Sequence, residues 1–188
     1  MNVYDFDKTI YDGDSTVHFY FYCIKRHPRI LLRLPALLWY ALLFMFKIYT
    51  KTQFKEKFYL FLKDVPDVDK EVASFWETHE KNIKGFQKKG GLVISASPEF
   101  LLAPICQKLK MNLIASRVDK HTGKYTGENC WGEEKVHRFT EIYGDTEIAE
   151  FYSDSFSDSP LADLAKSAFM VKKEEITPWN KNQTEINI

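Results

Sequence analysis

Residues 3–9 read VYDFDKT, and this stretch decides the fold because an apolar strand ends there at two carboxylates. The residues from Asn2 to Phe6 predict a short strand, followed by an acidic loop. Ligands of parallel α/β sheets bind beyond the carboxyl ends of the strands. Asp5 and Asp7 can therefore point into one pocket, one as nucleophile or metal ligand and the other as general acid/base. A solvated acidic turn that only caps a helix is the alternative.

The rest of the chain alternates between predicted strands and helices, which favours an α/β protein with a parallel, Rossmann-like sheet. A helical spacing of apolar residues runs from Val68 to about Lys89, and residues 117–127 predict a β-hairpin. The further strands are expected at residues 92–95, 112–116, 148–152 and 168–171, and further helices at 98–110, 133–143 and 160–166.

Polar residues also follow two other predicted strands. Ser95 and Ala96 precede a predicted helix N-terminus, where hydroxyl and backbone N–H groups can bind an anion. Asp154 and Asp158 follow the strand at 148–152, and Lys135 begins a predicted helix. Taken singly, these are an ordinary helix cap, a loop acid and a solvated lysine. Together, the carboxylates at one sheet edge would repel each other without a cation such as Mg²⁺, and Lys135 and Ser95 could then balance a phosphate.

Composition excludes several classes of protein. The 188 residues carry 26 basic and 26 acidic side chains, and this zero balance argues against nucleic-acid binding. The cysteines Cys23, Cys106 and Cys130 are odd in number and form no CxxC pair, which argues against a disulfide framework and a zinc site. The first residues lack the basic and apolar regions of a signal peptide, so we expect a cytoplasmic protein, with or without peripheral attachment at the inner face of the membrane.

Charge is unevenly distributed. Residues 23–57 contain eight basic residues and one acidic residue, around the uncharged run LPALLWYALLFMF at 34–46. These 13 residues are too few to span a bilayer, which takes about 20. Extension to residues 30–49 is possible only with Arg33 and Lys47 near the ends. Two interpretations remain open: a helix buried in a helical insert, or an interfacial helix on an anionic membrane surface.

The four ordered strings DFDKT (5–9), ISAS (94–97), Lys135 and SDSFSD (153–158) resemble the motifs of the haloacid dehalogenase superfamily, in its phosphoserine-phosphatase-like branch. The resemblance implies that Asp5 is the nucleophile, that Asp7 is the acid/base, and that Ser95, Ala96 and Lys135 bind phosphate. It implies a Mg²⁺ ion held by Asp5, Asp154 and the backbone carbonyl of Asp7. Thr9 and Asp158 would support the site.

The resemblance also implies how the chain is organised and what it acts on. Residues 1–14 and 85–188 would form the catalytic core, and residues 15–84 a helical cap inserted after the first strand. The strings RHPRILLRLPALLWYALLFMF (26–46), NLIAS (112–116), GEEKV (132–136) and YSDS (152–155) resemble the phosphatidylglycerophosphatase C group of the superfamily. The implied function is Mg²⁺-dependent hydrolysis of a phosphomonoester through an aspartyl-phosphate, with a lipid phosphate such as phosphatidylglycerophosphate as substrate.

The sequence does not decide between a hydrolase and a phosphotransferase, which would pass the phosphate to an acceptor other than water. Two further alternatives remain. One is a phosphatase of phosphoserine or another small soluble phosphomonoester, which would need buried charged partners in the cap. The other is a non-enzymatic membrane-interaction protein on an inactive fold of the same family, and the joint presence of Asp5, Asp7, Lys135 and Asp154 argues against it.

Overall fold

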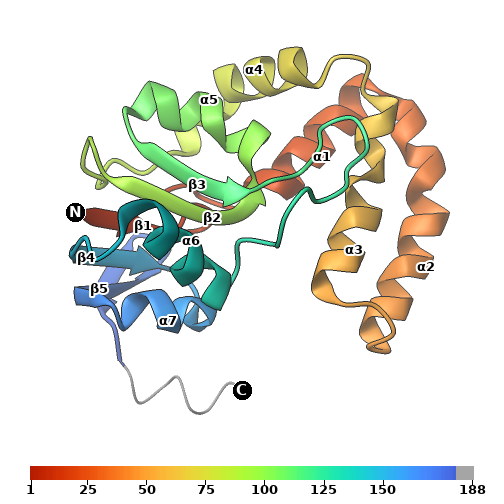
Figure 1. The fold of residues 1–188 in the computed structure, drawn as a ribbon. Coiled ribbons are helices and arrows are strands. Elements are labelled where there is room, and N and C mark those ends of the chain that lie inside the picture. Colours follow the sequence, from red (N-terminus) through yellow and green to blue (C-terminus); the bar gives the residue numbers. More distant parts are fainter. Residues whose placement is uncertain (181–188) are drawn as a thin grey trace.

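The computed structural model describes residues 1–180, and its centre is a six-stranded sheet (Figure 1). The strand order is β3-β2-β1-β4-β5-β6, and all neighbours are parallel except the antiparallel pair β5 and β6. The strands are β1 Asn2–Tyr4, β2 Leu92–Pro98, β3 Asn112–Ser116, β4 Ile148–Ser153, β5 Ala165–Lys172 and β6 Glu175–Pro178. The predicted α/β fold with a Rossmann-like parallel sheet is confirmed.

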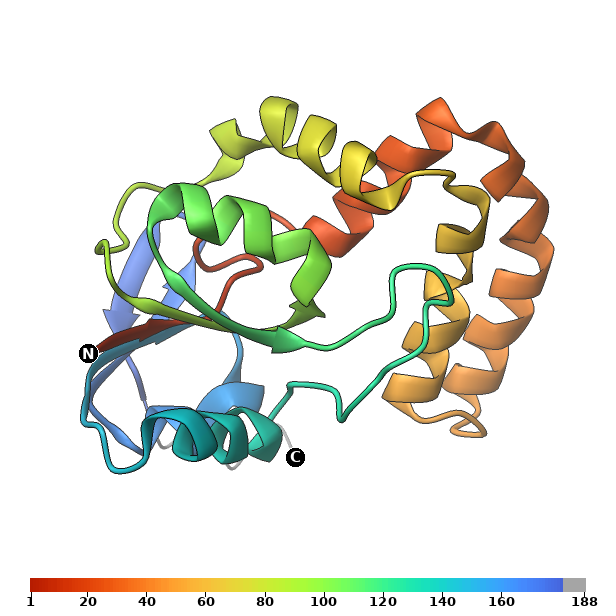
Figure 2. The same cartoon turned by 45° about the horizontal axis from the view of Figure 1, so that its top comes forward.

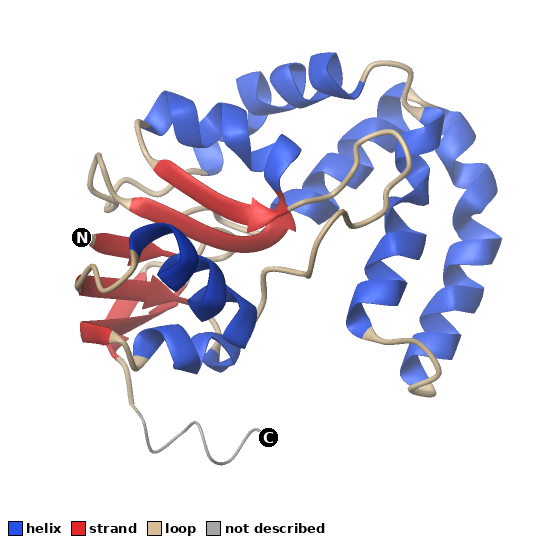
Figure 3. Cartoon of the chain, viewed as in Figure 1, coloured by secondary structure: helices blue, strands red, loops and turns tan. Residues whose placement is uncertain are grey.

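Helices cover both faces of the sheet (Figure 3). Successive side chains of a strand point to opposite faces, so Val3 and Tyr4 of β1 enter different hydrophobic clusters. Tyr4 packs in the cluster that contains side chains of α4 (Val68–His79) and α5 (Glu99–Leu109). Val3 packs in the cluster with side chains of α6 (Glu133–Tyr143) and α7 (Ser159–Ala162).

The register of the central strands brings their carboxyl ends together. Tyr4 of β1 lies opposite Val93 of β2 and Tyr152 of β4. The backbone N–H of Asp5 donates to the carbonyl of Tyr152 at 2.8 Å, which continues the ladder one residue past β1. The residues that follow β1, β2 and β4 therefore meet at one edge of the sheet.

Between β1 and β2 a loop over residues 5–14 is followed by an insert whose elements, from residue 15 to residue 82, are all helices joined by short turns. Its two middle helices, α2 and α3, form a hairpin that stands beside the sheet, and the loop between β3 and α6 runs along α3 in both ribbon views (Figures 1 and 2). The elements are α1 Ser15–Arg26, η1 Pro28–Arg33, α2 Leu34–Met45, α3 Lys51–Phe58, η2 Tyr59–Asp64, α4 Val68–His79 and η3 Glu80–Asn82.

Ion pairs and apolar packing hold the insert in place. Glu71 on α4 accepts a hydrogen bond from Arg26 Nε at 2.6 Å and lies 3.2 Å from His27 Nε2. Arg33 at the end of η1 pairs with Asp64 at the end of η2. The same hydrophobic cluster that holds Tyr4 of the sheet also contains much of the insert. The division into a core and a cap at residues 15 and 84 stays a prediction, because this cluster continues across it.

Three local predictions were wrong. The helix predicted to reach Lys89 ends at His79, because Ile83 bridges to Tyr11 and the N–H of Lys84 donates to the carbonyl of Ile10 at 2.7 Å. Residues 117–127 form a turn with one isolated bridge, between Val118 and Tyr125, rather than a two-stranded hairpin. The helix expected at 160–166 stops at Ala162, where β5 soon begins.

The apolar run of the insert is not a buried helix. None of the residues of α2 is buried. Residues 28–45 are long and apolar enough to cross a membrane by length and composition alone, with a mean hydropathy of 1.4, and 6 % of this stretch is buried. Nine of the fifteen exposed large apolar side chains in residues 1–180 lie here and in the following turn. We call these nine the apolar hairpin surface: Leu31, Leu32, Leu38, Trp39, Leu42, Phe44, Met45, Phe46 and Ile48.

Candidate active site

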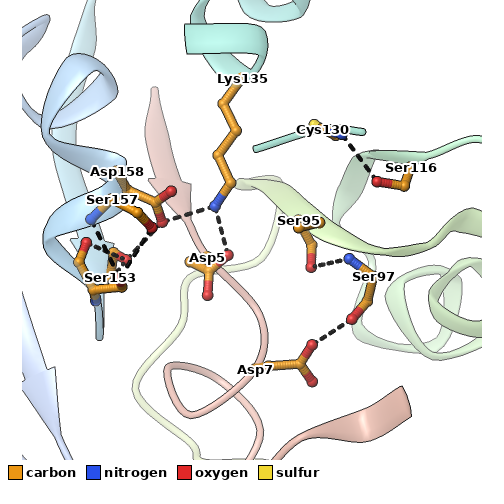
Figure 4. A network of polar contacts seen from close by, with 12 residues as sticks. Asp5, Asp7, Ser95, Ser97, Ser116, Cys130, Lys135, Ser153, Ser157 and Asp158 are labelled. Carbon is orange, nitrogen blue, oxygen red and sulfur yellow. Dashed lines mark hydrogen bonds and ion pairs between the residues drawn. The ribbon is translucent and has the colours of Figure 1, made fainter. Parts of the chain in front are cut away.

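A buried ion-pair network lies where β1 and β4 end (Figure 4). The Nζ atom of Lys135 donates to Asp5 Oδ1 and to Asp158 Oδ2, both at 2.7 Å. Asp158 Oδ2 also accepts from the hydroxyl of Ser153 at 2.7 Å. Lys135 is 2 % exposed, so one cation serves two carboxylates almost out of contact with water.

Local sequence explains how Lys135 reaches this network. Gly132 has φ 59°, the left-handed region that glycine enters without strain, and α6 begins at the next residue. Lys135 stands in the first turn of that helix, and Asp158 stands just before α7. The predicted meeting of Asp5, Lys135 and Asp158 is therefore what the structure contains.

Burial and the neighbouring charges shift the pKa values of Lys135 and Asp5. Burial opposes the charged form of Lys135, but the carboxylates of Asp158 and Asp5 outweigh it and raise the pKa of Lys135. Burial raises the pKa of Asp5 above its ordinary value; the charge of Lys135 opposes this shift, and the charges of Asp158 and Asp154 add to it. A further positive charge near Asp5 would stabilise its ionised form.

Asp7 is held by a second set of contacts. Its Oδ1 accepts from the backbone N–H of Ser15 at 2.6 Å, and its Oδ2 accepts from the hydroxyl of Ser97 at 2.5 Å. Burial, followed by the charge of Asp14, raises the pKa of Asp7 to about 6. An acid with such a pKa can hold a proton near neutral pH and release it, as a general acid/base must.

Sequence reasoning missed Ser97. The sequence suggests that it caps the helix after Pro98, but α5 has no side-chain cap, and Ser97 orients Asp7 instead. The available signal was the spacing of Ser95 and Ser97, which places both on one side of a strand. The two serines are linked, because the N–H of Ser97 donates to Ser95 Oγ at 3.1 Å (Figure 4).

A cavity of about 630 Å³ opens between the sheet edge and the insert. Ser95, Ala96 and Lys135, the expected phosphate-binding residues, line it together with Asp5 and Asp7. The insert contributes mainly apolar side chains to the opposite wall. They are Val17, Leu37, Leu38, Ala41, Phe54 and Phe58.

Thr9 and Lys8, in the loop after β1, differ in their position relative to the cavity. Thr9 does not line the cavity; it is fully buried, and its hydroxyl has no hydrogen-bond partner within residues 1–180. Lys8 lines the cavity from a left-handed backbone position with φ 58°. Its charge is the main influence that opposes the upward pKa shift of Asp154, a shift that burial causes. Lys8 therefore adds positive potential beside Asp154.

The donor chemistry fits a hard cation. Asp5, Asp7 and Asp154 all line the cavity, burial raises the pKa of each, and carboxylate oxygens are the ligands that Mg²⁺ prefers. Asp158 Oδ1 is buried without a partner in the described part of the chain. Residues 1–180 contain no group of three His, Cys, Asp or Glu side chains that could hold a metal ion. The expected ligands are two side chains and one backbone carbonyl, so this set does not require such a group.

These features define a class of α/β hydrolase in which the carboxylates of the active site follow the first strand. A helical insert covers the cavity that leads to them. The family model described as haloacid dehalogenase-like hydrolase matches residues 3–163, and the chain belongs to this family. The protein is similar to CicA of Caulobacter vibrioides, with 29% identity over 91 residues. That alignment covers 44% of this chain and 41% of CicA, so less than half the length of the relative is matched.

Solved structures share the fold. A protein of unknown function from Bordetella pertussis Tohama I aligns with a TM-score of 0.69 and 19% identity, over 89% of this chain and 87% of that one. A phosphoserine phosphohydrolase-like protein from Francisella tularensis aligns with a TM-score of 0.53 and 15% identity, over 93% of this chain and 90% of that one. At such identities the likeness shows the fold alone.

Proposed function

We propose that this hydrolase cleaves phosphomonoesters through an aspartyl-phosphate on Asp5. The observation that carries the proposal is the buried network of Asp5, Lys135 and Asp158 beside the cavity. Lys135 occupies Asp5 Oδ1, whereas Oδ2 accepts no hydrogen bond from residues 1–180. That oxygen is the one available to attack phosphorus.

The reaction has two steps in this scheme. Asp5 attacks phosphorus, the bond to the leaving oxygen breaks, and Asp7 gives that oxygen its proton. Asp7 then takes a proton from water, the water oxygen attacks phosphorus, and inorganic phosphate leaves Asp5. Lys135, Ser95 and the backbone at Ala96 stabilise the phosphoryl oxygens. Mg²⁺ held by Asp5, Asp154 and the carbonyl of Asp7 would supply further positive charge against these oxygens.

The cavity favours a lipid phosphate as substrate. Its insert side is mainly apolar, and Leu38 both lines the cavity and belongs to the apolar hairpin surface. A phosphate group could thus react at Asp5 while apolar chains extend along α2 and α3. Phosphatidylglycerophosphate is one such substrate. Phosphoserine or another small soluble ester is the second candidate, and it would leave the apolar side chains of the insert wall without a partner.

The apolar hairpin surface supports attachment to an anionic membrane. Leu32 is 82% exposed, and Met45 and Phe46 are each 75% exposed, which is unusual for side chains of this size in a soluble monomer. Arg29 and Lys47 flank them in the chain. Through residues 23–57, the protein would lie at the cytoplasmic face of the membrane.

The activity is tested with p-nitrophenyl phosphate in Mg²⁺. Asp5→Asn should lower turnover by at least about 1,000-fold, because an amide cannot form the acyl phosphate. Asp12→Asn, a change of an exposed carboxylate in the same loop, is the matched control and should retain activity. Residual Asp5→Asn activity within about tenfold of wild type, or about 1.4 kcal/mol of barrier, would remove Asp5 as nucleophile.

Substrate class and membrane attachment need separate assays. Hydrolysis of phosphatidylglycerophosphate should exceed that of phosphoserine. Co-sedimentation with phosphatidylglycerol vesicles should be strong for wild type and weak for a Met45→Ser, Phe46→Ser variant. The control is Ile142→Ser, Leu164→Ser, which changes exposed apolar residues outside the insert. Vesicle binding without hydrolysis of any ester would favour the non-enzymatic alternative.

A further inference from the structure

Two lysines of α3 face the cavity from the insert. Lys51 and Lys55 both line it, on the wall contributed by α3. Lys55 Nζ donates to the carbonyl of Ala96 at 3.0 Å and to Asn129 Oδ1 at 3.4 Å. Lys51 Nζ lies 4.3 Å from the ring centroid of Trp131. These contacts are a carbonyl, an amide oxygen and an aromatic face, so none of them carries a negative charge.

Other basic residues of the insert have different surroundings. Arg26 and Arg33 pair with Glu71 and Asp64. Within residues 1–180, neither Lys51 nor Lys55 forms an ion pair with a carboxylate. Two lysines one helical turn apart therefore present positive charge to a shared cavity without a directly paired carboxylate.

The surroundings of the two lysines disfavour their charged forms. Burial, and next the charge of Lys51, lower the pKa of Lys55 to about 8. Burial also lowers the pKa of Lys51. The charged groups that influence Lys55 are Lys51 on the same helix, Asp14 and Asp7 from the loop after β1, and Lys135 from α6. An anion placed between the two lysines would favour their charged forms.

We propose that Lys51 and Lys55 bind a second anionic group of the substrate, separate from the phosphomonoester that reacts at Asp5. The inference rests on the proposed function, because it assigns another part of the same substrate. A phosphodiester that links the reacting head to apolar chains fits this position best, since Leu37, Ala41 and Phe54 line the same cavity as the lysines. The lysines would thereby select the substrate rather than perform its hydrolysis.

Two short-chain lipids test the inference. Dihexanoyl phosphatidylglycerophosphate has a phosphomonoester and a phosphodiester, whereas dihexanoyl phosphatidic acid has the monoester alone. The wild-type ratio of kcat/KM for the first lipid over the second should be about 10 to 100, the effect expected for a hydrogen bond to a charged group. Lys51→Met and Lys55→Met should each lower this ratio at least about fivefold.

The matched control is Lys57→Met. Lys57 lies on the same helix but contacts the ring of Tyr40, at 5.4 Å from its centroid, and it does not line the cavity. Its removal should leave the ratio of the two lipids as in wild type. Phosphoserine is the third substrate, because its carboxylate is a second anionic group without apolar chains. If Lys51→Met and Lys55→Met lower kcat/KM for phosphoserine as much as for dihexanoyl phosphatidylglycerophosphate, the lysines recognise charge alone, and the assignment to a lipid phosphodiester is overturned.

The possible results separate the inference from the proposed function. Equal losses on both lipids would mean that the lysines act on the reacting phosphoryl group, and would overturn the inference while the phosphatase stands. An unchanged ratio in Lys51→Met and Lys55→Met would overturn it as well. If wild type hydrolyses p-nitrophenyl phosphate but neither lipid, the lipid part of the proposed function fails, and if it hydrolyses none of the three, the proposed function fails. In both cases calorimetric titration of the two lipids decides the inference, and equal dissociation constants would overturn it.

Discussion

Replacement of Lys135 by methionine should destabilise the protein strongly. Lys135 donates to Asp5 and Asp158 at 2.7 Å each and is 2% exposed. Methionine keeps most of the side-chain volume but leaves two buried carboxylates without their cation. Loss of one partner of a buried ion pair costs about 3–5 kcal/mol. We expect a value near the lower limit, about 3 kcal/mol, because a buried carboxylate can take up a proton instead of remaining charged.

The pH dependence of the loss has a defined sign. Burial already raises the pKa of Asp5, and removal of Lys135 takes away the main opposing influence. A carboxyl whose pKa is higher in the folded than in the unfolded state destabilises the fold above that pKa, and the penalty disappears as the pH falls through it. The difference in unfolding free energy between variant and wild type should therefore be larger at pH 8 than at pH 5.

Urea unfolding, followed by circular dichroism at both pH values, measures this difference. The control is Lys120→Met, which removes a surface ion pair with Asp69 and should cost about 0–1 kcal/mol. A Lys135→Met loss below about 1 kcal/mol at pH 8, or one that grows as the pH falls, would refute the assigned role of the buried network.

Three further predictions concern the reaction itself. Asp154→Ala should raise the Mg²⁺ concentration needed for half-maximal activity at least about tenfold, and EDTA should abolish wild-type activity; full activity in EDTA would contradict the proposed cation. Ser97→Ala should lower kcat about 10-fold or more with little change in KM, because Asp7 loses a hydrogen bond that orients it, and an unchanged kcat would count against that role. For a substrate with two anionic groups, kcat/KM should fall above pH 8 as Lys55 loses its proton, and Lys55→Arg should keep it constant to higher pH; identical profiles would exclude titration of Lys55.

The sequence predicted elements well where local patterns decide them. The predicted strand at 112–116 and helix at 133–143 agree with β3 and α6 to the residue. The helix after Val68 was extended too far because Ile83 and Phe86 continue its apolar spacing. In the structure both lie outside any helix, and Phe86 contacts the rings of Tyr4 and Tyr152. Contacts between residues so far apart in the chain leave no local periodicity to read.

The same limit applies to the site. The strand exits were sufficient to place Asp5 and Asp158 at one edge of the sheet, because parallel strands share one functional edge. Lys135 reaches that edge from the first turn of α6. The contact between Ser97 and Asp7 depends on the register of β2 against the loop after β1, which a sequence does not specify. The orientation of Lys51 and Lys55 toward the cavity depends on how α3 packs against the loop before α6, where Lys55 donates to Asn129. From the sequence alone, both lysines contributed only to the positive charge of residues 23–57.

In the structure, the basic residues at 23–57 make different kinds of contact. Of the eight basic residues at 23–57, Arg26 and Arg33 are engaged in ion pairs of the insert. Lys51 and Lys55 face the cavity. The charge free to attract an anionic surface is therefore well below the total, at about 1 kcal/mol for each basic residue near the membrane. Membrane attachment would then depend mainly on the apolar hairpin surface, and salt should weaken it less than the loss of Met45 and Phe46 does. The same insert would place apolar side chains toward lipid and two lysines toward the reacting site, which is the polarity required to draw an anionic head group from a bilayer to Asp5.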